Sequence, residues 1–277
     1  METNVGDPAK QFADLMNSGR ALMKDGKIEE ALVQFNAAVK VLPIAGIAHF
    51  DRATAFHKLG ETNKAEISYG IALAMLPSDQ QERVYAYLNR GSLRENQGDV
   101  EGAIADLQRA SGPGAPLDLE ERIERLKAQR DRDESSGDRE IQALQDMCDQ
   151  GKSLASSHPL VALALLTEVA ERVPPIASVF HRRGVANAAS NRMGPALEDF
   201  KTTLDLEPDQ TCIRAEALFN YGSILEGLGR NEEALAAYEE CLTLSTNEEV
   251  EFPEAAGEEA AQAIMRRLQA KVERLSG

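Results

Sequence analysis

A pattern of one small residue, one large residue, a second small residue and a proline recurs along the chain, and this repeat constrains the fold more than any other feature. It first appears as Ala31, Phe35, Ala38 and Pro43, and all four positions return 34 residues later. Six copies can be located by their first small residue, which is Ala31, Ala65, Ala103, Ala162, Ala196 or Ala234. A fixed period of this length indicates a chain built from similar units stacked side by side.

Each copy predicts a pair of helices. Apolar residues recur at helical spacing in two runs of about a dozen residues. Between the runs lies a residue that can end a helix in a left-handed conformation, namely Gly26, Gly60, Gly98, Asn191 or Gly229. The small residues allow two antiparallel helices to approach closely where they face a bulky partner such as Phe35 or Phe200. We therefore expect every copy to be a helix-turn-helix hairpin.

With these motifs the chain resembles the tetratricopeptide-repeat family, whose unit is a 34-residue helix-turn-helix with an L-G-x2-Y, A-x3-F and P pattern. The segments YLNRG at 87–91 and EEALAAYEECLTL at 232–244 match it well, and the resemblance covers about residues 12–110 and 140–245. His49 and Asn187 depart from the pattern at positions that are usually large and apolar. The resemblance implies an all-α solenoid.

The repeats also duplicate as blocks, because the spacings of 34 and 38 residues between Ala31, Ala65 and Ala103 recur in the second half of the chain. The offset between the blocks is 131 residues. Residue types that the repeat does not require recur at this offset as well, since Asn89, Ser92 and Glu95 correspond to Asn220, Ser223 and Glu226. We interpret this as an internal duplication of a three-repeat block.

An amphipathic segment follows each block and is expected to form a capping helix, because a stacked repeat leaves its last apolar face open. The apolar positions are Leu119, Ile123 and Leu126 after the first block, and Ala261, Ile264, Leu268, Val272 and Leu275 after the second. The polar stretch at 133–138 reads as a junction. We therefore predict one unit at 1–136 and another at 137–277.

Composition narrows the classes of function. The formal net charge of −16 disfavours a nucleic-acid partner, because such proteins use basic groups to contact phosphates. Three widely spaced cysteines without a C-x-x-C motif indicate neither a disulfide framework nor a zinc site, which fits a reducing compartment. The longest apolar stretch, 160–166, is far shorter than the roughly 20 residues that span a bilayer. We expect an acidic cytoplasmic protein that does not insert into membranes.

No constellation of residues predicts catalysis, a metal or a cofactor. Gly151, Lys152 and Ser153 resemble the end of a phosphate-binding loop, but the earlier glycine of that motif is replaced by Asp146 and a helix precedes it. The four histidines lack metal-ligand spacing, and Cys148 has no local signature of a nucleophile. The sequence therefore predicts a non-enzymatic protein.

Binding is the favoured function, because the first helices of stacked hairpins line a concave face. The candidate residues on that face combine aromatic, amide, hydroxyl and positive groups, which suit an extended peptide or helix of a partner protein. They are Arg20, Phe50, Thr54, Tyr85, Asn89 and Ser92 in the first block, and Lys152, His181, Arg182, Phe219, Asn220 and Ser223 in the second.

Two alternatives stay open for the duplicated asparagines: Asn89 and Asn220 could clamp the backbone of a ligand, or bond to the neighbouring repeat. Arginines recur at Arg52, Arg90 and Arg183, where the family often pairs the guanidinium with an adjacent repeat, and we interpret them as structural.

A clamp for the acidic tails of Hsp70 or Hsp90, a known use of the family, is disfavoured, because Asp51 and Glu216 occupy positions where the clamp needs positive or amide groups. The sequence thus predicts an adaptor or scaffold. The alternative from another class is a structural protein that self-associates into homo-oligomers through its repeats or capping helices.

Overall fold

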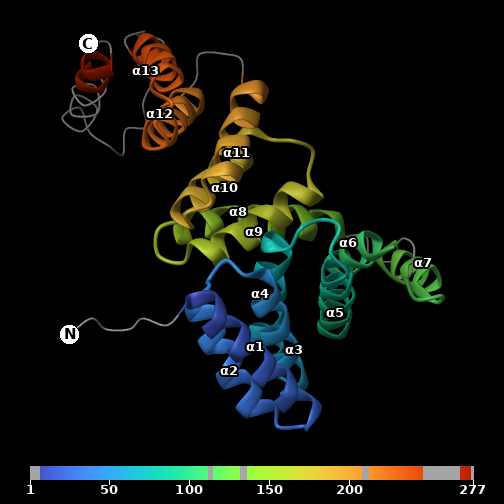
Figure 1. Cartoon of the computed structure of the whole chain (residues 1–277). Coiled ribbons are helices and arrows are strands. Elements are labelled where there is room, and N and C mark those ends of the chain that lie inside the picture. The colour runs from blue at the N-terminus through green and yellow to red at the C-terminus, as the bar shows by residue number, and fades with distance from the viewer. Residues whose placement is uncertain (1–6, 112–114, 132–135, 208–211, 246–268, 276–277) are drawn as a thin grey trace, which may run out of the picture. The chain divides into compact units, whose positions relative to one another are not determined.

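The structure is a computed structural model that describes residues 7–111, 115–131, 136–207, 212–245 and 269–275 (Figure 1). All regular secondary structure in these residues is helical, which confirms the predicted all-α class. The chain divides into two compact units, residues 1–147 and 148–277. The division falls inside α8, so the boundary near residue 136 stays a prediction.

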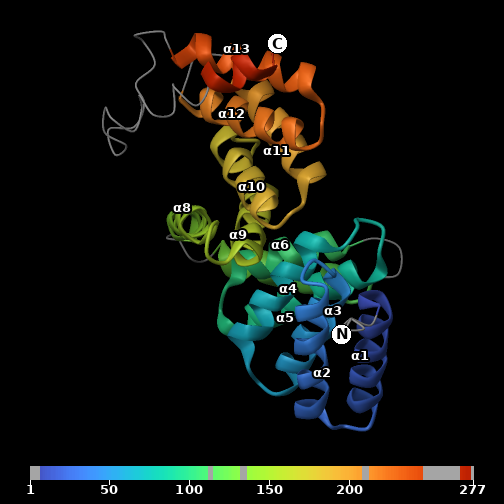
Figure 2. The same cartoon turned by 60° about the vertical axis from the view of Figure 1, so that its left-hand side comes forward.

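The first unit contains three helix hairpins and one further helix. The hairpins are α1 (Pro8–Lys24) with α2 (Ile28–Val41), α3 (Gly46–Lys58) with α4 (Thr62–Met75), and α5 (Gln81–Gln97) with α6 (Val100–Ala110), and they are followed by α7 (Leu119–Arg130). Figure 2 shows α1 and α2 as an antiparallel pair joined by a short turn. Each hairpin packs on the next in chain order, since α2 contacts α3 and α4 contacts α5.

The second unit repeats this plan. Its elements are α8 (Ser136–Leu154), which begins in the first unit, α9 (Pro159–Arg172), α10 (Ala177–Ala189), α11 (Met193–Leu206), α12 (Cys212–Gly227), α13 (Asn231–Ser245) and a short helix at 269–275. We call this last element the C-terminal helix. The helices α10 and α11 form one hairpin, and α12 and α13 form another.

The five turn residues adopt the left-handed conformation that the sequence predicts. Four are glycines with φ between 74° and 83°, and the fifth, Asn191, has φ 59°. A side chain with a Cβ rarely adopts such a φ, but asparagine tolerates it better than most residues. The second helices end as predicted just before a proline, for example α2 at Val41 before Pro43.

Glycines on the first helices permit close packing against large side chains of the second helices. A Cβ atom at Gly19 would lie 2.5 Å from the Phe35 ring, and one at Gly222 would lie 2.8 Å from the Tyr238 ring. In the fourth hairpin Gly151 lies in the same way against Leu166. Gly151 is therefore a helix-packing residue inside α8, which accounts for its place in the sequence without a phosphate-binding loop.

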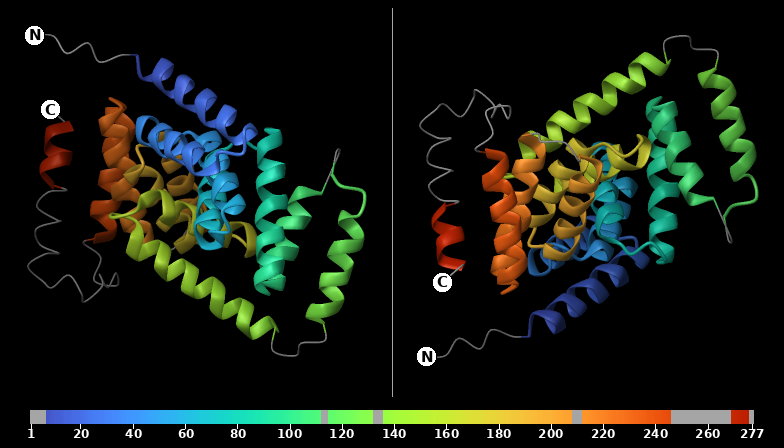
Figure 3. Two further views of the ribbon diagram at one scale, coloured as in Figure 1. Left: turned by 90° about the horizontal axis from the view of Figure 1, so that it is seen from below. Right: turned by 90° about the horizontal axis from the view of Figure 1, so that it is seen from above.

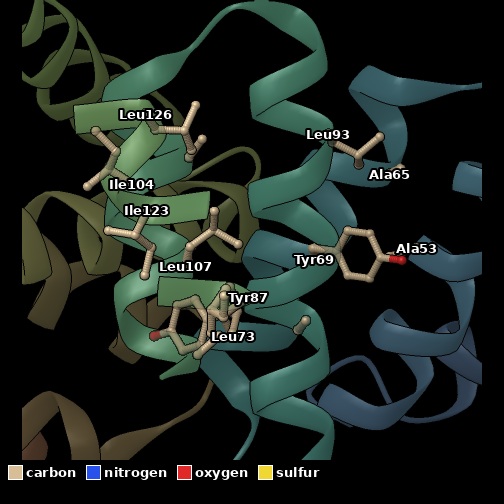
Figure 4. Close-up of a cluster of buried hydrophobic side chains, with 14 residues drawn as sticks. Ala53, Ala65, Tyr69, Leu73, Tyr87, Leu93, Ile104, Leu107, Ile123 and Leu126 are labelled. Atoms are coloured by element: carbon tan, nitrogen blue, oxygen red, sulfur yellow. The ribbon is translucent and has the colours of Figure 1, made fainter. Parts of the chain in front are cut away.

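The apolar core of the first unit continues through the hairpins into α7. Figure 4 shows Tyr69, Leu93 and Leu107 in one buried cluster with Ile123 and Leu126 of α7. Figure 3 shows α5, α6 and α7 following one another at one end of this unit. The helix α7 thus covers the last hairpin, as expected of a capping helix.

The C-terminal helix packs in a similar way at the end of the second unit. Val272 and Leu275 are partly buried against the cluster that α12 and α13 form. The other three predicted capping positions, Ala261, Ile264 and Leu268, lie outside the described residues.

The recurrent arginines are structural, but the predicted pairing with an adjacent repeat is wrong for two of them. Arg90 makes two hydrogen bonds to Asp106 at 2.8 and 2.6 Å, and Arg183 binds Asp199 at 2.6 Å. Each carboxylate lies sixteen residues later, on the second helix of the same hairpin. This partner satisfies the guanidinium within one hairpin, so the contact does not depend on a neighbour.

The two departures from the family pattern are polar residues with internal partners. His49 is 1% exposed, and its Nε2 lies 2.7 Å from the Pro43 carbonyl oxygen, to which it donates. Burial lowers the pKa of His49 to about 4, so the ring is neutral near pH 7. Asn187 donates to Asp199 at 2.8 Å. Both residues are therefore compatible with a buried position.

Candidate functional site

Five of the six predicted first-unit residues meet around one pocket of about 410 Å³. Arg20 comes from α1, Phe50 and Thr54 from α3, and Tyr85 and Asn89 from α5. These are the first helices of three successive hairpins, so the repeat itself brings their equivalent faces together. The remaining lining residues are Met23, Lys24, Phe35 and Asp51.

The apolar wall of the pocket is aromatic. Phe35 is fully buried, and the neighbouring Phe50 ring lies 6.0 Å from the Tyr69 ring in a tilted arrangement. Tyr85, in contrast, is 46% exposed and is available to a ligand. An aromatic wall with one exposed ring can enclose an apolar side chain of a partner.

The charged wall contains an internal ion pair. The Nε of Arg20 donates to Asp51 at 2.6 Å, and the Asp51 side chain is only 15% exposed. Burial raises the pKa of Asp51, although the Arg20 charge opposes this shift. Because the carboxylate of Asp51 already engages Arg20, the pocket does not present a free cluster of cations.

Both predicted asparagines bond to a neighbouring hairpin, which is one of the two alternatives that the sequence leaves open. The side chains of Asn89 and Thr54 hydrogen-bond to the Tyr69 hydroxyl, whose pKa burial raises. Asn220 lies 3.4 Å from the His181 Nε2. A side-chain amide has two donor hydrogens and a carbonyl acceptor, so one internal contact leaves capacity for a ligand.

In the second unit, the predicted residues His181 and Arg182 engage side chains of their own unit. Burial lowers the pKa of His181 to about 4, with the Arg182 charge acting in the same direction. Arg182 donates to the Cys148 Sγ at 2.9 Å and to Asp149 at 3.3 Å. These contacts hold both side chains against the first helices of neighbouring hairpins.

The other charged and aromatic candidates of the second unit lie around α12. Lys152 lies close enough to Glu216 that its charge opposes the burial-driven rise in the pKa of that carboxyl. The Phe219 ring packs 6.1 Å from the Tyr238 ring.

The two predicted serines lie at the ends of the units, where they contribute to holding the last helix. Ser92 accepts a hydrogen bond from Arg122 of α7 at 3.0 Å and donates to the Leu88 carbonyl. Ser223 lies 3.2 Å from the Tyr238 hydroxyl, which also bonds to Lys271 of the C-terminal helix. Ser92 is not among the residues that line the pocket.

Sequence reasoning missed three lining residues, Met23, Lys24 and Phe35. Phe35 is a core residue by its pattern, but the missing side chain at Gly19 lets its ring extend toward the inner face. The signal was therefore present in the sequence as a glycine opposite an aromatic.

The described residues offer no site for a bound metal and no membrane span. No group of three or more His, Cys, Asp or Glu side chains among them could hold a metal ion. No described helix is both long and apolar enough to cross a membrane.

Stacked helix hairpins with a fixed period define the chain as an α-helical repeat protein. Two models of the tetratricopeptide repeat match it, one at residues 16–80 and the other at residues 84–112 and 215–248. The chain belongs to the tetratricopeptide-repeat family.

Curated relatives and solved structures share this repeat. DnaJ homolog subfamily C member 3 of Homo sapiens is 26% identical over 230 residues, which cover 82% of this chain and 41% of the relative. Tetratricopeptide repeat protein 36 of Danio rerio is 31% identical over 106 residues, which cover 38% of this chain and 57% of that protein. The TPR2AB domain of yeast Sti1 in a complex with pHSP90 is 15% identical, with a TM-score of 0.38, and the match covers 97% of this chain and 100% of that one. The chain spans less than half the length of the DnaJ relative.

Proposed function

We propose that this chain is a non-catalytic adaptor whose first unit binds an extended segment of a partner protein in the pocket between α1, α3 and α5. Tetratricopeptide-repeat proteins generally mediate protein–protein interactions. The observation that carries the proposal is the convergence of Arg20, Phe50, Thr54, Tyr85 and Asn89 on one pocket. Residues from three successive hairpins can contact several consecutive residues of a ligand.

The chemistry of the pocket supports a peptide rather than a small charged metabolite. Phe50 and Tyr85 suit an apolar side chain, while Thr54 and Asn89 suit the backbone amides beside it. A volume of about 410 Å³ lies within the range of ligand-binding pockets. Recognition thus combines one apolar anchor with hydrogen bonds to the peptide backbone.

A carboxylate-tail clamp of the Hsp70 or Hsp90 type is not part of the proposal. Asp51 places a negative charge in the pocket, and its ion pair occupies the Nε of Arg20. Glu216 places another carboxylate, 46% exposed, on the corresponding helix of the second unit. Either carboxylate would repel an acidic tail.

The proposal includes a reducing compartment such as the cytoplasm. Cys148, Cys212 and Cys241 are all free thiols. Proteins of oxidising compartments more often pair their cysteines. The alternative function, self-association as a structural protein, would give a concentration-dependent dimer in sedimentation velocity.

The test is a selection of short peptides from a random display library on the full chain, followed by fluorescence anisotropy on purified variants. We expect Tyr85→Ala to weaken a selected peptide at least about tenfold, which corresponds to about 1.4 kcal/mol. Tyr69→Phe is the matched control for Asn89→Ala, because it removes the internal partner of Asn89 without removing a pocket residue. Asn89→Ala should weaken binding, and Tyr69→Phe should not. Equal affinity of wild type and Tyr85→Ala for every selected peptide would refute the pocket as the site.

A further inference from the structure

Each unit holds its last helix through one glutamate on the last inner helix. Glu95 of α5 accepts hydrogen bonds from Arg122 at 2.6 Å and from Arg125 at 2.8 Å. Glu226 of α12 accepts from Lys271 at 2.6 Å and contacts Arg274. In both units one cation is about one-quarter exposed, 25% and 28%, and the other is largely exposed, 65% and 62%. The two contacts therefore have the same design.

This glutamate marks the end of a unit rather than a position in every repeat. The corresponding positions in earlier hairpins hold Met23, His57 and Ala188. Inside a unit the next hairpin covers that position, whereas at the end a helix with two cations covers it. The acid is therefore matched to the helix that it receives.

The two received helices also share a sequence pattern. Residues 122–126 read RIERL and residues 271–275 read KVERL. Both place cations three residues apart and an aliphatic residue directly after each cation, so one helix face carries both charges and both apolar groups. The pattern defines the chemistry that these ends recognise.

Polar neighbours orient the glutamate of the second unit. The Tyr238 hydroxyl donates to Glu226 at 2.8 Å and accepts from the Lys271 Nζ at 3.0 Å. Ser223 lies 3.2 Å from the same hydroxyl. A receptor built from three linked side chains is preorganised for a cation.

The two ends differ in how completely their helix is buried. Leu119, Ile123 and Leu126 of α7 are 2–3% exposed, so α7 is part of the core. In the C-terminal helix, Val272 and Leu275 are only partly buried. The second helix therefore depends more on its two cations than α7 does, and a better-matched helix can replace it.

We propose that the end of the second unit, formed by Glu226, Ser223, Tyr238 and Leu242, is a docking site for a cationic amphipathic helix of a partner protein. The partner helix carries the pattern cation, aliphatic, any residue, cation, aliphatic. The C-terminal helix occupies the site as an internal competitor, and it acts at the high effective concentration of a ligand on the same chain. The net charge of −16 favours the approach of a basic helix. This site is separate from the peptide pocket of the first unit.

The experiment uses the full chain and a labelled peptide with the sequence of residues 117–131, which contains RIERL. The variant Lys271→Glu/Arg274→Glu removes the internal competitor, and fluorescence anisotropy measures peptide binding. We expect the variant to bind the peptide at least about tenfold more tightly than wild type. Adding Glu226→Lys to this variant should reverse the gain. A control peptide with glutamate in place of both RIERL arginines should not bind.

Three results would overturn the proposal. They are equal binding of the control peptide, binding that is insensitive to Glu226→Lys, and a variant that dimerises in sedimentation equilibrium, which would assign the site to a second copy of this chain. If circular dichroism shows that the charge-reversed variant has lost helix, Lys271→Ala/Arg274→Ala provides the same release with a milder change. The same tenfold comparison then decides the outcome.

Discussion

The inner surfaces of the two units are built from equivalent repeat positions but carry different chemistry. Where the first unit has Asp51 paired with Arg20, the second has Arg182 at the position of Asp51, and there Arg182 binds Asp149 and Cys148. Glu216 replaces the exposed Tyr85. Only the asparagine is common to both surfaces, and each one bonds to a neighbouring hairpin.

The ends of the two units, in contrast, are alike. Glu95 and Glu226 each receive two cations, and Ser92 and Ser223 each join the network. The duplicated block therefore kept the residues that close the unit and changed the residues that face a ligand. Residue identity between the halves reports on architecture here, and residue difference reports on binding.

The largest expected effect separates the buried ion pairs of the two units. Arg90 and Asp106 are 4% and 2% exposed, whereas Arg183 is 22% exposed. Removing one partner of a buried pair costs about 3–5 kcal/mol. We expect Asp106→Ala to lower the free energy of unfolding by this amount and Asp199→Ala to lower it by less. Urea denaturation of both variants measures the difference, and an equal loss would contradict the comparison.

Acidification should destabilise both units through one buried histidine in each. The pKa values of His49 and His181 are about 4 in the folded chain, below the ordinary value of 6.5. Folding favours the neutral ring, so this contribution is complete above pH 6.5 and is lost as the pH falls from 6.5 to 4. For each histidine the loss is on the order of 3 kcal/mol. Urea denaturation between pH 7 and pH 4 measures it, and His49→Gln and His181→Gln should each flatten the profile.

Closing the gap at a packing glycine should have a smaller effect. A Cβ at Gly19 would lie within 3.0 Å of three atoms of the Phe35 ring, which also lines the pocket. Overpacking of this kind costs about 1–3 kcal/mol. We expect Gly19→Ala to lower the melting temperature and to weaken a pocket-binding peptide. Gly222→Ala, against Tyr238 in the second unit, should lower the melting temperature and leave that peptide unaffected.

The smallest expected effect concerns a hairpin that lacks its acid. Arg52 has Ser68 at the spacing where Arg90 and Arg183 find an aspartate, and the buried Arg52 Nε has no hydrogen-bond partner. We expect Ser68→Asp to stabilise the chain by about 1 kcal/mol, because it adds a hydrogen-bonded carboxylate beside the arginine. Ser68→Asn, which has the same shape without the charge, is the matched control in urea denaturation.

The repeat pattern predicted most of the fold, because helix pairs, turns and close contacts depend on local residue types. Gly60 at a turn and Gly184 against Phe200 are visible as soon as the period is known. The pattern also predicted five of the pocket residues, since equivalent positions on successive first helices share one face. The partner of Arg90 was not predicted, because several acids lie within reach of a long side chain and only three-dimensional packing selects Asp106.

The end contacts illustrate a different limit. Glu95 and Glu226 stood out as duplicated residues, but their role depends on RIERL and KVERL, which lie outside the repeats and at a different offset. A periodicity search is insensitive to a match between a repeat and a segment that does not repeat. The contacts between Glu95 and Arg122 and between Glu226 and Lys271 became apparent only in space.

The glutamate that marks the end of a unit also makes the length of the array adjustable. A hairpin inserted between α4 and α5 would meet only surfaces of the repeat kind, while α5, α6 and α7 would keep their own contacts. A hairpin added after α6 would instead separate Glu95 from Arg122 and expose the apolar face of α7. Engineers who wish to lengthen the peptide-binding surface should therefore insert repeats in the interior and transplant α5 to α7 as one terminal cassette.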